Sequence, residues 1–120
     1  MVEDITVVST PYVSGYKITK VQGFTWGLIV RSRGIGGNFI AGLRTIAGGE
    51  IHEYTELLNQ SRQQALDRMK EHAKALGANA VISVGFDSSE IGQSMTEVLA
   101  YGTAVTIEPE TAAVNPVRLG

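Results

Sequence analysis

The stretch KALGANAVISVGFD, from Lys74 to Asp87, decides the fold because its periodicity changes in the middle. Before Gly77 the apolar residues recur at helical spacing, and after it they stand two apart, at Ala80, Ile82, Val84 and Phe86. A period of two is typical of a strand, and a glycine directly after a helical pattern is a common left-handed C-cap. We therefore predict a helix that ends at Gly77 and a strand over residues 80–86.

The helix before Gly77 is predicted to run from about Glu50 to Leu76. Its apolar stripe recurs at steps of three, four and seven: Ile51, Tyr54, Leu58, Ala65, Met69 and Leu76. A helix of this length spans about 40 Å, whereas a compact domain of this size has a radius of gyration of only about 13–14 Å. We expect the helix to overhang its own domain, so that another copy of the chain covers part of the stripe.

Further strands are predicted over residues 5–9, 16–32 and 95–107. In the second of these the alternation slips between Val21 and Gly23, as at a β-bulge. Beyond the slip, one face carries Phe24, Trp26, Leu28 and Val30, and the other carries Thr25, Gly27, Ile29 and Arg31. The last strand has small residues on one face that leave room for a helix, namely Ala100, Gly102 and Ala104.

These elements predict a single domain over residues 1–107 that contains several strands, one long helix and one short helix. The short helix begins near Asn38, a good N-cap residue. A polar connection is expected over residues 87–94 and a flexible tail over residues 108–120. At 120 residues the chain can bury a hydrophobic core without help from disulfides or metal ions. The absence of cysteine excludes disulfides and thiolate metal sites.

The amino-acid composition of the chain excludes some classes of binding partner. The formal net charge is -2, and no basic run is present that would displace counterions from a nucleic acid. We also find neither a secretory signal nor an apolar run long enough to span a bilayer, so we expect a cytoplasmic protein. Charged residues make up 18% of the chain, below the roughly 25% of soluble domains. This deficit favours burial of part of the surface against identical subunits.

A glycine-rich loop, RSRGIGGNF, lies between a predicted strand and a predicted helix. Backbone amides in such a loop can bind an anion, and nearby arginines would add positive charge. The candidate ligand-binding residues are therefore Arg31, Arg33, Gly36, Gly37 and Asn38. The loop does not match a dinucleotide fingerprint or a P-loop, so a purely structural turn is the alternative interpretation.

The candidate metal ligands are His52 and Glu56, which stand one helical turn apart. A solvated first turn of the helix explains the same pair. His72, the other histidine, lies about 30 Å further along a straight helix and is expected to be half-buried or at an interface. Further acids that could bind a divalent ion are Glu53, Asp87, Glu90 and Glu97. No catalytic set of residues emerges and no cofactor is indicated, so we do not expect an enzyme.

The order of several motifs resembles that of the YbjQ family of uncharacterised proteins, also called the putative heavy-metal-binding family. The most specific pieces are LGANAV followed by a strand and the closing GTAV, residues 102–105. The resemblance covers about residues 5–107. It implies a small α+β subunit, in which a small antiparallel sheet packs against one long and one short helix, and which assembles into a ring-like homopentamer. It carries no established activity or catalytic residues.

Together these observations predict a homo-oligomer, most simply a pentamer, that binds a small ligand or acts as a scaffold at its subunit interfaces. Two alternatives stay open. One is a protein that binds divalent or heavy-metal ions, and the other is an enzyme with an anion site at the glycine-rich loop. Trp26, which shares a strand face with Phe24, is expected to pack in the core or at an interface.

Overall fold

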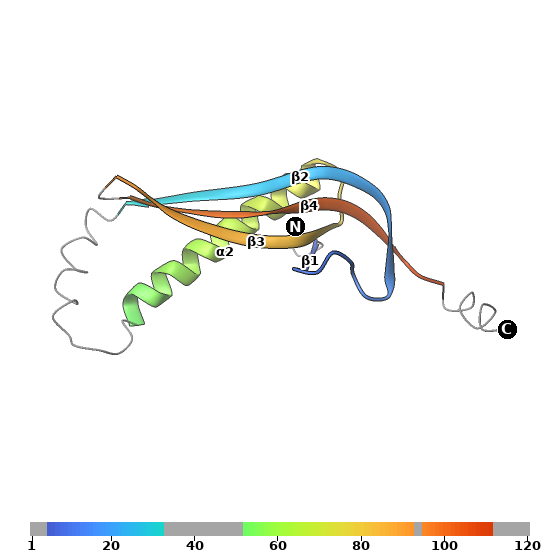
Figure 1. The fold of residues 1–120 in the computed structure, drawn as a ribbon, viewed down its shortest axis with the longest axis horizontal. Helices are drawn as coiled ribbons and strands as arrows, with labels where there is room; N and C mark the ends of the chain where they lie inside the picture. Colours follow the sequence, from blue (N-terminus) through green and yellow to red (C-terminus); the bar gives the residue numbers. More distant parts are fainter. Residues whose placement is uncertain (1–4, 33–51, 93–94, 112–120) are drawn as a thin grey trace.

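A four-stranded sheet carries a single long helix on one face in the computed structural model of the chain, which describes residues 5–32, 52–92 and 95–111 (Figure 1). The elements are β1 (Thr6–Val7), β2 (Tyr16–Ser32), α2 (His52–Ala75), β3 (Ala80–Ile91) and β4 (Met95–Pro109). The strand order is β1-β3-β4-β2. The α+β class is therefore confirmed, while the expected short helix after Asn38 lies outside the described residues.

The sheet is mixed, which corrects the prediction of a purely antiparallel sheet. β4 pairs with β2 and β3 in the antiparallel sense, but β1 runs parallel to β3, with Thr6 opposite Ala80. Only two residues of β1 form the ladder, fewer than the five predicted. Periodicity within one short segment says nothing about the direction of its partner strand, so the sequence pattern could not reveal this pairing.

Two strands are longer than predicted. β3 continues to Ile91, where a polar connection was expected, because main-chain pairing with β4 persists as far as Ile91 opposite Met95. The exposed polar side chains in the second half of β3 made its sequence resemble that of a loop. β4 likewise ends at Pro109 rather than at Ile107, so the start of the predicted tail belongs to the sheet.

The predicted bulge in β2 is confirmed. The register with β4 shifts between Ile18 and Lys20 and again between Val21 and Gly23. Gly23 has a φ of 132°, a conformation that other residues rarely adopt. Beyond it, the faces alternate as predicted: Thr25, Gly27 and Ile29 are buried beneath the helix.

The helix packs closest at Gly27. A β-carbon on Gly27 would lie 2.2 Å from the main-chain oxygen of Ala65 and 2.3 Å from the main-chain nitrogen of Met69. The small residues of β4 were expected to leave room for this close approach of the helix to the sheet. Ala100 and Ala104 are indeed fully buried, but a β-carbon on Gly102 would meet side-chain and main-chain atoms of β3 rather than the helix.

The buried face of α2 matches the predicted stripe in part, at Ala65 and Met69. Its fully covered residues recur every four positions, at Ser61, Ala65, Met69 and Ala73. Leu76, placed in the stripe from the sequence, is 38% exposed because it follows the end of the helix, where Gly77 with a φ of 88° turns the chain toward β3. The left-handed C-cap predicted at Gly77 is thus confirmed.

Candidate functional site

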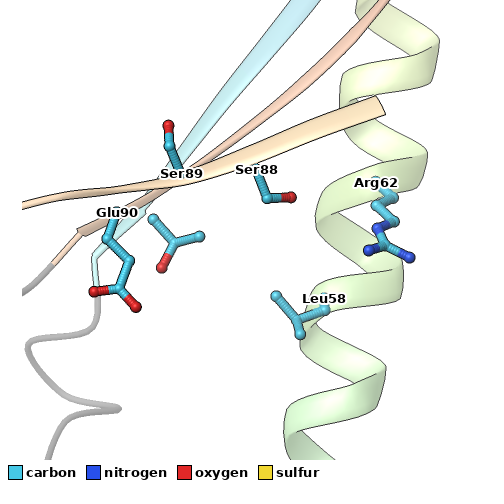
Figure 2. Close-up of a pocket in the computed structure, with 6 residues that line it drawn as sticks. Leu58, Arg62, Ser88, Ser89 and Glu90 are labelled. Atoms are coloured by element: carbon cyan, nitrogen blue, oxygen red, sulfur yellow. The ribbon is translucent and has the colours of Figure 1, made fainter. Parts of the chain in front are cut away.

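A pocket opens between the first half of α2 and the far ends of β3 and β4 (Figure 2). In this region the helix diverges from the sheet (Figure 1). The pocket has a volume of about 270 Å³, and it is lined by Leu58, Arg62, Ser88, Ser89, Glu90 and Thr96. Among the described residues, this lining combines a cation, an anion, hydroxyl groups and one aliphatic side chain.

Strand alternation determines what each β3 residue contributes. Ser88 points toward the helix, whereas the Ser89 side chain points away from it in Figure 2. The Ser89 hydroxyl instead donates a hydrogen bond to Oε1 of Glu97 at 2.9 Å. Ser88 therefore supplies the pocket hydroxyl on this strand, since successive side chains of a strand face opposite sides.

Arg31, a candidate ligand-binding residue, contacts the helix. Its Nε donates to Oγ of Ser61 at 3.0 Å, and its Nη2 donates to Oε1 of Gln64. Ser61 is only 1% exposed, and its hydroxyl in turn donates to the main-chain oxygen of Leu57. These bonds fix the guanidinium of Arg31 between β2 and α2. The remaining candidates of the glycine-rich loop, namely Arg33, Gly36, Gly37 and Asn38, lie outside the described residues.

The candidate metal pair keeps its helical spacing, since His52 begins α2 and Glu56 stands one turn further along. Glu56 is exposed, and the side chain of His52 lies outside the described part of the chain. Within the described residues, no three histidine or acidic side chains form a group that could hold a metal ion. Asp87 and Glu97 lie on the sheet face away from the helix, whereas Glu90 lines the pocket on the other face.

His72 is half-buried, as predicted, and contacts β2. Its Nδ1 lies 2.8 Å from the hydroxyl of Thr25, and its ring centroid lies 4.6 Å from that of Trp26. Trp26 also stacks on Phe24 with centroids 5.5 Å apart. The side chains therefore link the helix to the apolar row of β2.

The sheet face away from α2 is apolar along β2. Phe24, Trp26, Leu28 and Val30 are 60%, 46%, 37% and 47% exposed. No described element covers this face, which we call the open face of the sheet. Such a row of large exposed apolar side chains is typical of an interaction surface.

Arg62, Ser88 and Thr96 were not predicted as pocket residues. A longer β3 would have revealed Ser88, because residues 88 and 90 would then alternate onto the helix face, whereas Arg62 lies on α2 and Thr96 on β4. The serines instead made this half of the strand resemble a loop. The divergence of α2 from the sheet, which creates the pocket, has no counterpart in the periodicity.

The model of the YbjQ family, described as "Putative heavy-metal-binding", matches residues 5–108. The chain belongs to this family. It is 82% identical over its whole length to a UPF0145 protein of Methanocella arvoryzae and 74% identical to one of Methanoregula boonei, in each case covering the full length of both chains. A bacterial relative, from Bradyrhizobium, is 55% identical over 91% of this chain and 98% of its own.

A solved structure shares the fold of this YbjQ-family chain. It is a protein of unknown function from Pediococcus pentosaceus, assigned to the DUF74 family, with a TM-score of 0.57 and 15% identity. The match covers 87% of this chain and 98% of the other. No helix in the described part of the chain has both the length and the apolar character needed to cross a membrane.

Proposed function

We propose that this YbjQ-family protein works as a homo-oligomer, most simply a pentameric ring, that binds a small ligand or serves as a scaffold and catalyses no reaction. The observation that carries the proposal is the apolar row on the open face. Alternate residues of the same strand, Thr25, Gly27 and Ile29, are buried under α2, so β2 has apolar residues on both faces and a covering layer on only one.

A second copy of the chain is the occupant we propose for this face. An apolar face of a sheet is ordinarily buried against another layer of structure. Burying a large apolar side chain contributes about 1.5–3 kcal/mol, so covering the row would add substantially to stability. The charge deficit of the whole chain, 18% charged residues, agrees with a surface that is partly hidden between subunits.

The two outer edges of the sheet differ, and this difference favours a head-to-tail contact between subunits. Within the described residues, β2 pairs only with β4, and β1 covers only the first part of β3. The two outer edges therefore belong to different strands. A contact between unlike surfaces closes into a ring when the rotation permits. Arg68 donates to the main-chain oxygen of Leu28 at the outer edge of β2. This bond interrupts the edge, so a second subunit cannot form a continuous β-ladder along it. The apolar row on the open face would therefore form the contact.

Native mass spectrometry tests the assembly. We expect the wild-type chain at micromolar concentration to have the mass of several subunits. Phe24→Glu should shift the mass toward the single chain while leaving the circular dichroism spectrum unchanged, because the Phe24 side chain is 60% exposed in the isolated subunit. A charge buried in an apolar contact without a partner is strongly unfavourable.

Gln60→Glu is the matched control, since Gln60 is exposed on the helix and the change adds the same charge away from the open face. The control should keep the wild-type mass. A wild-type protein that is monomeric at micromolar concentration, or a Phe24→Glu variant with an unchanged mass, would contradict the proposal. Small molecules retained after gentle purification would be identified in the same spectra.

A further inference from the structure

We propose that the pocket between α2 and β3 binds a small zwitterionic carboxylate, of which an amino acid with a short aliphatic side chain is the simplest example. The pocket is formed by residues of one chain (Figure 2). The inference therefore stands independently of the assembly proposed above.

The sheet wall changes from apolar to polar at the pocket. One row across the helix face consists of Ile29, Val98 and Ser88, in register on β2, β4 and β3. The next row consists of Arg31, Thr96 and Glu90. In the first row Val98 is 1% exposed beneath the helix, whereas Ser88 is exposed and lines the pocket. In the second row Arg31 still contacts Ser61 and Gln64 of the helix, whereas Thr96 and Glu90 line the pocket.

Arg62 differs from the other arginines that the structure describes around α2. Arg31 donates to Ser61 and Gln64, and Arg68 donates to the main-chain oxygen of Leu28. Both are thereby used to hold the helix to β2. Among the described residues, no hydrogen bond or ion pair engages Arg62. Its planar fork of donors matches a carboxylate in a two-point contact.

Glu90 decides which anions fit. A carboxylate in the pocket wall repels a multiply charged anion such as phosphate, but it attracts an ammonium group. A carboxylate has about four acceptor positions, so Glu90 can accept from an ammonium in addition to any other contact. Because the pocket contains both the cation Arg62 and the anion Glu90, it favours a ligand that carries a positive and a negative charge. The hydroxyls of Ser88 and Thr96 can each donate or accept.

Size and apolar character narrow the ligand further. Pockets that enclose drug-sized molecules are about 300–1,000 Å³, and this one is about 270 Å³. Leu58 is the aliphatic side chain in the lining and points into the space between helix and sheet in Figure 2. The ligand is therefore small, with room for a short aliphatic group against Leu58.

Amide chemical-shift titrations of the full chain test the proposal, with L-alanine, acetate and inorganic phosphate as probes. We expect L-alanine to shift the amides of Leu58, Arg62, Ser88 and Thr96 in a saturable manner, with acetate weaker and phosphate weakest. Arg62→Gln should weaken the binding of L-alanine by more than about tenfold, because a hydrogen-bonded charge pair is lost.

Arg68→Gln is the matched control, since it removes one arginine from the same helix outside the pocket. It should bind L-alanine as the wild type does. The proposal is overturned if none of the probes saturates these amides, if phosphate binds more tightly than L-alanine, or if both variants lose binding equally. Mass measurements on the same samples report the oligomeric state, so a failure of assembly is recognised separately.

Discussion

The hydroxyl of Thr25 on β2 lies 2.8 Å from Nδ1 of His72 on α2 and also 3.2 Å from the main-chain oxygen of Met69. A hydroxyl has one proton, and the carbonyl oxygen can only accept it. When Thr25 donates to Met69, its oxygen accepts from His72 in the tautomer that carries the proton on Nδ1. The two contacts tie the last part of the helix to the edge strand.

Thr25→Val should lower the free energy of unfolding by about 1–2 kcal/mol, because the buried hydroxyl loses both bonds while the side-chain shape is kept. Combining it with His72→Ala should reveal a coupling of about 0.5 kcal/mol or more. Both are measured by urea unfolding at a fixed protein concentration. Thr103→Val, on the open face and without a side-chain bond within the described residues, is the control and should change stability by less than about 0.5 kcal/mol. Equal losses for Thr25 and Thr103 would contradict this role.

Gly27→Ala should destabilise the subunit by about 1–3 kcal/mol, because the added methyl would overlap the helix backbone at Ala65 and Met69. Backbone atoms of a packed helix cannot move singly, so the whole helix has to shift. Gly85→Ala is the matched control. Its methyl would meet the hydroxyl end of the Tyr101 side chain at 2.8 Å, and this half-buried ring can move. We expect a smaller loss for Gly85 in chemical denaturation; a larger one would contradict the close packing at Gly27.

Patterns within a segment predicted much of the fold. The bulge near Gly23, the C-cap at Gly77 and the bounds of β2 were all confirmed, because glycine conformations and side-chain alternation are local properties. The parallel pairing of β1 and the extension of β3 to Ile91 were not predicted. Both depend on main-chain bonds to distant strands, which side-chain patterns report only where one face is buried.

The candidate site was harder to predict than the fold. Arg31 was identified as a possible ligand-binding residue, but its donors contact Ser61 and Gln64. Arg62, one residue after Ser61, lines the pocket instead. A rotation of about 100° per residue around a helix separates these two environments. The sequence reveals that rotation only when the buried face is known, and the buried face includes Ala65 and Met69 of the predicted stripe together with Ser61, which the stripe left out.

Ser83 should tolerate glycine better than valine. It has a φ of 54°, within the irregular part of β3 between Ile82 and Gly85, and its main-chain nitrogen donates to the oxygen of Thr10. A branched side chain is strained in this left-handed region. Ser83→Val should therefore lose about 1–2 kcal/mol in thermal or urea unfolding, whereas Ser83→Gly should stay within about 1 kcal/mol of the wild type. Similar stabilities for the two variants would indicate a different conformation at this position.

Trp26, the one tryptophan in the chain, should report assembly through its fluorescence. Its side chain is 46% exposed in the isolated subunit and lies on the open face beside Phe24. If a second copy covers this face, dilution from micromolar to nanomolar concentration should shift the emission to longer wavelength and increase quenching by acrylamide, in step with the loss of mass.

A Trp26→Phe, Tyr12→Trp double variant provides the control for this measurement. Tyr12 is 59% exposed in the connection between β1 and β2, so its replacement should emit as exposed indole at every concentration. Emission from Trp26 that stays constant while the mass falls would place the subunit contact elsewhere. A parallel shift in both proteins would indicate unfolding on dilution, because only unfolding changes the environments of both positions.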